Sequence, residues 1–415
     1  MKVSMIGAGR VGLVVAACLA ELGNRITVID IDEDRLKEIS NKVSPVAEPG
    51  LNEILKEFEI EASSNYVRVM DSDIVFLCVS TPSKEDGSIL LEHVVKAAKQ
   101  IAGVLRRKAS YTLIAIKSTV IPGTTEEVVL PLLEKSGKKA GKDFGLCMTP
   151  EFLREGRGIE DFTHPARIII GEYDKKSGDI LCNLFQSFDA PILRTDLKTA
   201  EMIKYASNAF LTAKLSFINE IGNICKLLGI DVYEVAKGMG FDDRIGSKFL
   251  SAGIGFSGPC LPKDLRALIA RSKQIGYEPK LLEEVLNLNE RQVLKMLELL
   301  KKHISLKNSS IGALGLSFKS GTDDVKESKA ITVVDILLKE GAKVKVYDPQ
   351  AMHNFKRLFP QVEYTTPEEV LKCDAILILT EWEEFERLDY KGKIVIDGRR
   401  ISKAREARIY EGICW

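Results

Sequence analysis

The chain alternates short apolar runs with longer stretches in which apolar residues recur at helical spacing. In the first third, a strand-like run at 2–6 (KVSMI) precedes a small-residue turn and a helical pattern at 11–23. A second run follows at 26–30 (ITVID). Short apolar runs of this kind are typical of strands in a parallel sheet covered on both faces. The order of strand, helix and strand predicts a βαβ unit at the N-terminus.

The same alternation continues after this unit and returns in the last third of the chain. Strands that end in small polar loops are predicted at 72–82 and 111–124, and another runs into a polar loop within 144–162. The last third resembles the first without its glycine motif, which predicts a second doubly wound domain that holds a different nucleotide. Its strands and helix are predicted within 309–319, 331–349, 373–382 and 392–400.

Helical spacing dominates the centre of the chain, where long helices are predicted at 197–229 and 278–303. The sequence therefore predicts an α/β fold of two Rossmann-like doubly wound domains joined by a central helical region. The domains are predicted at 1–196, 197–303 and 304–415. The side chains of the third domain that suit a nucleotide diphosphate are Lys319, Arg399 and Arg400.

Composition narrows the class of protein. Lys+Arg and Asp+Glu both number 59, so no general nucleic-acid binding is expected. No apolar run has the length of a membrane span, and the first residues do not form a signal region, so a cytoplasmic protein without membrane contact is expected. The eight cysteines form no C-x-x-C pair and there are four histidines, so neither a metal site nor a disulfide framework is expected.

The turn after the first predicted strand reads GAGRVG and holds Gly7, Gly9 and Gly12 in G-x-G-x-x-G register. The first glycine suits a tight turn, the second a close approach of the backbone to a pyrophosphate, and the third close packing of helix and strand. Asp30 ends the second strand, where a carboxylate binds a ribose diol and repels a 2′-phosphate. The unit therefore predicts NAD as the cofactor.

Polar side chains follow several of the predicted strands. Thr81 and Thr119 fall at strand ends, where ligands bind in doubly wound sheets, although turn chemistry explains threonines there as well. Glu151 leads a charged cluster with Arg154 and Glu155, which on pattern alone describes a surface. Lys204 and Asn208 lie four apart on one helical face, and on pattern alone Lys204 reads as a lysine that extends its charge to solvent.

Cys260 differs from the other cysteines, most of which lie in apolar settings typical of a core. It stands in GIGFSGPCLPKDLRAL (253–268), just before a predicted helix with Pro262 at its start and Asp264 in its first turn. A helix N-terminus favours a reactive thiolate, and the preceding glycines leave room for a ligand. With a nicotinamide cofactor, a nucleophilic cysteine indicates oxidation of an aldehyde to the acid level through a thioester.

Together these segments resemble the UDP-glucose/GDP-mannose dehydrogenase family. The resemblance covers nearly the whole chain and rests on GAGRVGLVVAACLAELG, VIDID, EPGL, KSTVIPGTT, TPEFLREG, the helix of Lys204, FDDRIG, GPCLPKD, FKSGTDDVKES and DGR. It implies two Rossmann-like domains joined by a helical dimerisation region, and hence a homodimer. It also implies a four-electron oxidation of a sugar C6 alcohol to a carboxylate with two NAD⁺.

The resemblance also implies residue roles. Cys260 would carry the thiohemiacetal and the thioester, and Lys204 would stabilise the oxyanion beside Asn208. Asp264 and Thr119 would position water or relay protons, with Glu151 in acid–base steps. The implied cofactor contacts are Gly7, Gly9, Arg10, Val11, Gly12, Asp30, Arg35, Thr81, Thr119, Glu155, Lys263 and Lys326. The implied contacts to the nucleotide sugar are Glu151, Phe152, Leu153, Arg154, Lys204, Asn208, Phe249, Leu250, Ser251, Gly253, Ser257, Cys260, Lys319 and, across the dimer interface, Arg244.

The chain departs from the usual family motifs at Ser257, Pro259, Lys326 and Thr149, and none of these changes removes a catalytic group. UDP-glucose is the favoured substrate. GDP-mannose or a UDP-N-acetylhexosamine would keep the chemistry and change the sugar. A two-electron β-hydroxyacid dehydrogenase would need no nucleophilic cysteine, and a catalytically silent nucleotide-sugar-binding protein would not need the retained catalytic set.

Overall fold

The N-terminal βαβ unit supplies the second and third strands of an eight-stranded sheet in the computed structural model, which describes residues 1–415. The strand order is β3-β2-β1-β4-β5-β6-β7-β8, and the β6–β7 pair alone is antiparallel. β1 pairs in parallel with β2 and with β4, so the glycine turn after β1 lies at the point where the strand order reverses. The strands are β1 (Lys2–Ile6), β2 (Arg25–Ile29), β3 (Ile60–Ser63), β4 (Ile74–Leu77), β5 (Leu113–Ile116), β6 (Gly145–Met148), β7 (Ile168–Glu172) and β8 (Ile192–Thr195).

Apolar residues cover both faces of this sheet. In β4, Ile74 and Phe76 belong to the core under α1, whereas Val75 and Leu77 belong to the core under α4. Successive side chains of a strand point to opposite faces, so a fully apolar strand needs helices on both sides. The helices of this unit are α1 (Arg10–Glu21), α2 (Glu33–Ser40), α3 (Leu51–Glu57), α4 (Glu92–Leu105), α5 (Leu130–Glu134), α6 (Gly158–Thr163), α7 (Lys175–Phe185) and the first residues of α8 (Leu197–Leu228).

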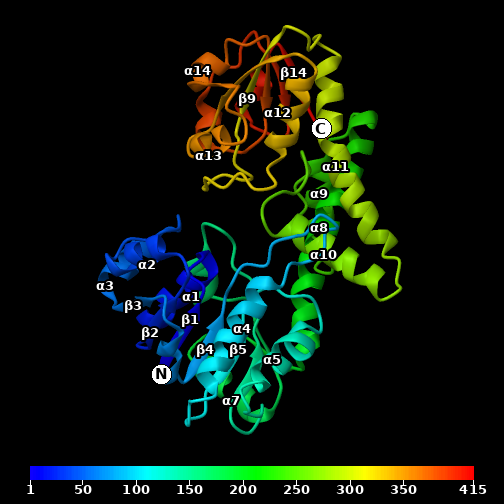
Figure 1. Cartoon of the computed structure of the whole chain (residues 1–415). Coiled ribbons are helices and arrows are strands. Elements are labelled where there is room, and N and C mark those ends of the chain that lie inside the picture. Colours follow the sequence, from blue (N-terminus) through cyan, green and yellow to red (C-terminus); the bar gives the residue numbers. More distant parts are fainter. The chain divides into compact units, whose positions relative to one another are not determined.

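The second sheet has six strands, and all of its pairs are parallel, in the order β11-β10-β9-β12-β13-β14. Its strands are β9 (Ser310–Leu314), β10 (Lys343–Tyr347), β11 (Glu363–Tyr364), β12 (Ala375–Ile378), β13 (Ile394–Asp397) and β14 (Ile409–Gly412). Its short helices are α12 (Lys329–Lys339), α13 (Met352–Lys356) and α14 (Pro367–Val370), which Figure 1 shows around the sheet.

The central helices share a core with this second sheet. Ile218 of α8 and Met296 of α11 belong to the same buried cluster as Ile311 of β9 and Ile396 of β13. The chain accordingly divides into two units, Met1–Ser207 and Asn208–Trp415, and the three domains expected from the sequence stay a prediction. The remaining helices of this unit are α9 (Val232–Gly240), α10 (Leu261–Gln274) and α11 (Lys280–Lys301).

The predicted fold class, two doubly wound α/β parts with helices between them in sequence, is confirmed by these two sheets. Five of the eight cysteines are buried, which agrees with their apolar sequence settings, and Cys260 is exposed. No helix combines the length and the apolar character that crossing a membrane requires.

Candidate active site

The glycine turn between β1 and α1 has the shape that its sequence predicts. Gly7 has φ +108°, and a Cβ there would lie 2.7 Å from the Cys78 carbonyl oxygen. A Cβ on Gly12 would lie 2.0 Å from the Gly7 carbonyl oxygen, so the start of α1 packs directly on the turn. A Cβ on Gly9 would meet nothing within 4 Å. Protein packing thus requires two of the glycines, and the third faces open space.

The surroundings of Gly9 fit a dinucleotide. No side chain caps α1, so the N–H groups of its first turn remain directed toward an approaching phosphate. Asp30 lies beside the turn: its Oδ2 accepts a 2.5 Å hydrogen bond from the Ala8 N–H, and its Oδ1 accepts one of 3.0 Å from the Asp32 N–H. The carboxylate therefore braces the glycine turn and still has lone pairs for a ribose diol.

Replacing Gly9 with alanine should weaken NAD binding at least about tenfold while leaving the fold intact, because the added methyl group would occupy the space in which a pyrophosphate approaches the backbone. Gly9 has φ −71°, which alanine adopts without strain. Calorimetric titration with NAD⁺ and the thermal midpoint would measure both effects. Gly103→Ala on α4, where a Cβ also meets nothing within 4 Å, is the matched control. Unchanged NAD affinity in Gly9→Ala would contradict this use of the turn.

The other expected cofactor residues of the first unit lie in four places. Arg10 forms an ion pair with Glu155. The Thr81 hydroxyl donates to the Thr119 carbonyl at 2.9 Å, so these two strand-end loops do meet. Arg35 is paired with Asp32 at the start of α2, and Val11 packs its side chain on the core under α1. Lys326 belongs to the second unit and is exposed there.

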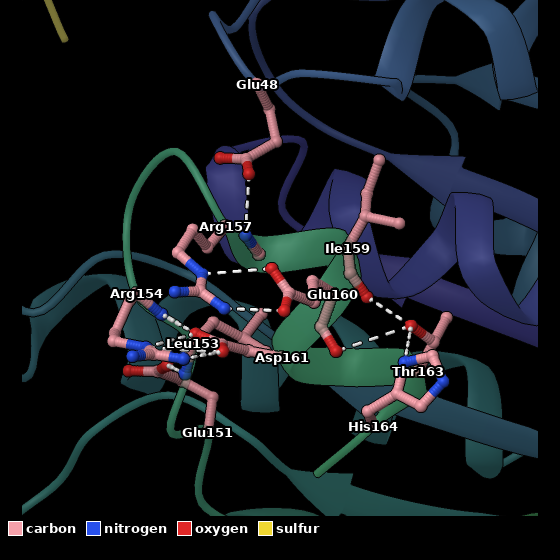
Figure 2. Close-up of polar contacts among 11 residues, drawn as sticks. Glu48, Glu151, Leu153, Arg154, Arg157, Ile159, Glu160, Asp161, Thr163 and His164 are labelled. Atoms are coloured by element: carbon pink, nitrogen blue, oxygen red, sulfur yellow. Dashed lines mark hydrogen bonds and ion pairs between the residues drawn. The ribbon is translucent and has the colours of Figure 1, made fainter. Parts of the chain in front are cut away.

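Ion pairs and hydrogen bonds of charged side chains hold the segment 151–164, which follows β6 (Figure 2). The Arg154 side chain forms a forked ion pair with Asp161, with the Arg154 Nη2 to Asp161 Oδ1 distance at 2.5 Å. Glu48, from the EPGL segment, accepts hydrogen bonds from the N–H groups of Gly156 and Gly158 at 3.1 and 2.6 Å. The guanidinium group and the backbone N–H of Arg154 are therefore both engaged by Asp161.

Glu151 and Lys204 form a buried ion pair with 2.9 Å between Lys204 Nζ and Glu151 Oε1. Their side chains are 8% and 5% exposed, so neither the surface reading of Glu151 nor the solvent-extended reading of Lys204 holds. Burial alone would raise the pKa of Glu151. The charge and hydrogen bond of Lys204, the N–H of Leu153 and the charge of Lys117 outweigh burial and hold that pKa below its usual range.

In the second unit, Cys260 is the N-cap residue of α10 and is exposed. The helix begins one residue earlier than expected, with Leu261 first and Pro262 second, and the Asp264 N–H donates to the Cys260 carbonyl at 2.9 Å. The buried Asp264 carboxylate accepts from Asn208 Nδ2 at 2.6 Å and from Lys263 Nζ at 2.6 Å. The first turn of α10 thus brings Asp264 close in sequence to Cys260, and Asp264 in turn contacts Asn208 of α8.

Packing within the second unit requires glycine at three positions before Cys260, and the expectation that these glycines leave room for a ligand stays a prediction. A Cβ on Gly253 would lie 2.5 Å from the Gly398 carbonyl oxygen, one on Gly255 2.4 Å from Asn289 Oδ1, and one on Gly258 2.6 Å from the Phe318 ring. The space beside each glycine is already filled by other parts of the second unit.

Buried amides hold the same loop. Asn289 both accepts from the Phe256 N–H (2.7 Å) and donates to the Phe256 carbonyl (3.1 Å). The Asn219 oxygen accepts from the Gly253 N–H at 2.8 Å, and the Gln292 amide donates to the Gly253 carbonyl at 2.9 Å. The approach to Cys260 is therefore rigid.

The remaining expected substrate residues are spread over the second unit. Arg244 pairs with Asp242, and its side chain is 84% exposed. Phe249 has φ +62°, Leu250 is buried and Ser251 is exposed. The Ser257 hydroxyl donates to the Phe318 carbonyl at 3.0 Å, and Lys319 Nζ lies 5.8 Å from the centre of the Phe318 ring.

Two arginines expected to suit a diphosphate are engaged with the protein. Arg399 pairs with Glu381, and Arg400 pairs with Asp231 while stacking on the Tyr233 ring at 3.8 Å. Arg400 uses both of its Nη atoms in the pair with Asp231, whereas Arg399 uses its Nε atom. Paired Nη atoms occupy the fork that a diphosphate would need.

Sequence reasoning missed several residues that shape these places. Lys117 is buried at the end of β5, next to Ser118 and Thr119. The sequence feature that could have indicated its burial is its position directly after the apolar run LIAI. Glu48 and Asp161 order the segment after β6. The amides that hold the cysteine loop gave no signal, because each lies on a helix far away in the sequence.

Comparisons with known proteins agree with this arrangement. Family models of the UDP-glucose/GDP-mannose dehydrogenases match residues 1–189 (NAD binding domain), 198–291 (central domain) and 312–404 (UDP binding domain). The chain is 41% identical to the UDP-glucose 6-dehydrogenase AglM of Haloferax volcanii, over 100% of both chains. It is 39% identical to the UDP-glucose 6-dehydrogenase YwqF of Bacillus subtilis, over 98% of this chain and 95% of that one.

A solved structure is similar along the whole chain. The UDP-glucose dehydrogenase of Pyrobaculum islandicum has a TM-score of 0.97 and 38% identity, covering 100% of this chain and 98% of that one. The predicted cofactor, NAD, and the predicted type of enzyme, an NAD-dependent nucleotide-sugar dehydrogenase, are confirmed by these matches. The chain belongs to the UDP-glucose/GDP-mannose dehydrogenase family.

Proposed function

We propose that this enzyme oxidises the C6 alcohol of UDP-glucose to a carboxylate and forms UDP-glucuronate. The observation that carries the chemistry is an exposed cysteine at the N-cap of α10 with a buried carboxylate, Asp264, in the next turn. An NAD-binding unit alone would serve a two-electron oxidation, and the cysteine adds the second one. The relatives named as UDP-glucose dehydrogenases support this sugar.

The overall reaction balances in atoms and electrons. One sugar alcohol, one water and two NAD⁺ give one carboxylate, two NADH and three protons. NAD⁺, when bound, accepts the hydride in each of the two oxidations. The glycine turn with Gly9 and the free N–H groups of α1 would hold its pyrophosphate, and Asp30 would accept from its ribose.

Side chains of the protein would carry out the covalent steps and the proton transfers at C6. In the first oxidation the C6 hydroxyl loses its proton and the carbon loses a hydride, which gives an aldehyde. The Cys260 sulfur adds to the aldehyde carbon and forms a thiohemiacetal, which loses a second hydride and becomes a thioester. Water then adds to the thioester, the carbon–sulfur bond breaks, and the thiol of Cys260 is restored.

Four further side chains would each support one part of this reaction sequence. Lys204 would stabilise the oxygen that becomes negative when sulfur or water adds to the carbonyl carbon. Glu151, held ionised by its buried ion pair, would accept protons. Asp264, fixed by Asn208 and Lys263, would orient the attacking water with the help of Thr119.

The nucleotide sugar would be held by the backbone of 151–155, the loop 249–253, Ser257 and Lys319. A loop backbone offers both N–H and carbonyl groups, which suits the many hydroxyls of a sugar. The UDP group would bind in the C-terminal part, where the family model is a UDP binding domain. Lys319 would supply its positive charge.

The test is the amount of NADH formed per mole of limiting sugar. UDP-glucose should give two NADH, and GDP-mannose and the UDP-N-acetylhexosamines should be poor substrates at the same concentration. Two NADH from another sugar would keep the chemistry and replace the substrate. One NADH per sugar would contradict the thioester route and favour a two-electron dehydrogenase.

We also propose that the enzyme is a cytoplasmic homodimer joined through its central helices. Phe210, Phe217 and Ile224 are exposed at intervals of seven residues along α8 and therefore lie on one face of that helix. A contiguous exposed apolar face is typical of a protein interface. Light scattering of the full chain should give the mass of two chains, and a monomer mass would contradict the proposal.

Arg244 would reach the substrate of the other copy.

A further inference from the structure

Lys117 is a buried ammonium group that the proposed reaction does not yet use. β5 and β6 are parallel neighbours in which Ile116 is opposite Met148, so Lys117 follows β5 beside Thr149, which follows β6. Lys117 Nζ donates to the Thr149 carbonyl at 3.4 Å, two residues before Glu151. Lys117 as a whole is 5% exposed. A lysine kept this far from water requires a reason, since burial disfavours its charge.

Burial and three neighbouring groups determine the pKa of Lys117. Besides burial, which lowers the pKa of Lys117, the groups that shift it are Cys78, Glu151 and Lys204. The thiol of Cys78 has its pKa raised to about 12 by burial, so it is uncharged at neutral pH. Lys117 and Lys204 are both buried, and the charges of both lower the pKa of the buried Glu151 carboxylate.

We infer that Lys117 is a positioning residue, whose buried positive charge beside the Glu151–Lys204 pair keeps Glu151 ionised for its acid–base step. The inference rests on the proposed function, because it gives Glu151 that step. Lys204 contacts Glu151 directly, and Lys117 acts on the same carboxylate through its field and through the backbone at Thr149. The role belongs to the charge of Lys117 and not to its hydrogen bond alone.

Removing the charge should shift the acid limb of the kcat/KM pH profile. In Lys117→Met the Glu151 carboxylate loses a nearby cation, so its pKa rises and the limb moves about one pH unit higher. Lys117→Gln, which keeps a hydrogen-bond donor without charge, should shift the limb in the same direction. Lys117→Arg should return it toward the wild-type position. KM for NAD⁺ should stay within about twofold, because Lys117 is not a proposed cofactor contact.

Lys108→Met is the matched control. Lys108 is also buried, at 4% exposure, and donates to a carbonyl, that of Met70, but its charged neighbours are Asp71, Asp73 and Lys2. This variant should leave the acid limb where it is. An unshifted limb in Lys117→Met, or a uniform loss of rate without a shift, would overturn the inference.

A second measurement does not depend on turnover. Glu151 has a lowered pKa in the folded protein, so it stabilises the fold above its unfolded pKa and that contribution is lost as pH falls through the folded pKa. In Lys117→Met the folded pKa of Glu151 moves toward the unfolded value, so this loss should be smaller and should be complete at a higher pH, as read from thermal midpoints between pH 3 and 6. NADH per sugar in the wild type tests the function separately, so one NADH there would overturn the function and leave the comparison of stability profiles valid.

Discussion

Replacing Cys260 with alanine is expected to abolish carboxylate formation, with kcat for the complete oxidation lower by at least about 10³-fold. Without the sulfur there is no thiohemiacetal, so the second hydride has no covalent intermediate to leave from. Cys260 is exposed, and its replacement should change the thermal midpoint little. Product analysis together with NADH counting would measure the loss.

Two companion variants make the Cys260 result specific. Cys182→Ala removes a partly buried cysteine that has no proposed role, and it should retain two NADH per sugar. Cys260→Ser keeps a weaker oxygen nucleophile, and intact-protein mass spectrometry should find a sugar ester that is hydrolysed slowly. Two NADH per sugar from Cys260→Ala, at a rate within about tenfold of wild type, would refute the thioester route.

Replacing Lys204 with methionine should lower both activity and stability by large factors. Loss of one preorganised donor to an oxyanion slows a reaction about 10²- to 10³-fold. The same change leaves the Glu151 carboxylate buried without its ion-pair partner, and breaking a buried pair in this way costs about 3–5 kcal/mol. Steady-state rates and urea unfolding would give the two losses.

The double variant Lys204→Met with Glu151→Gln separates stability from chemistry. Removing the unpaired Glu151 carboxylate should raise the free energy of unfolding above that of Lys204→Met, and it should not restore activity. Lys198→Met, on the same helix but 49% exposed and paired with Glu126 and Glu127, should cost less than about 1 kcal/mol. If Lys204→Met were as stable as wild type, the ion pair would not hold this part of the fold.

The parts of the fold that the sequence predicted are those with long local signals. β4 and β5 are wholly apolar, and α8 extends over 32 residues, so their patterns were unambiguous. β3 (IEAS) and β8 (ILRT) were missed because their residues are mixed in polarity and only half-buried. Such strands are fixed by their neighbours in the sheet rather than by their own composition.

The candidate site divides in the same way. The glycine turn and the cysteine at the helix start are local motifs, and the sequence located both. The burial of Lys204 was not readable, because its partner Glu151 is 53 residues away in the chain. The packing that requires glycine before Cys260 was not readable either, because a sequence cannot show that Asn289 and Phe318 lie beside these glycines.

The two hydrogen bonds that Asp30 accepts have a consequence for engineering cofactor preference. The usual way to admit a 2′-phosphate is to remove the acid at the end of the second strand. Here that change would also withdraw the acceptor from the N–H groups of Ala8 and Asp32. A variant retargeted to NADP would therefore need a replacement acceptor for these amides, or its turn would lose the conformation that binds either dinucleotide.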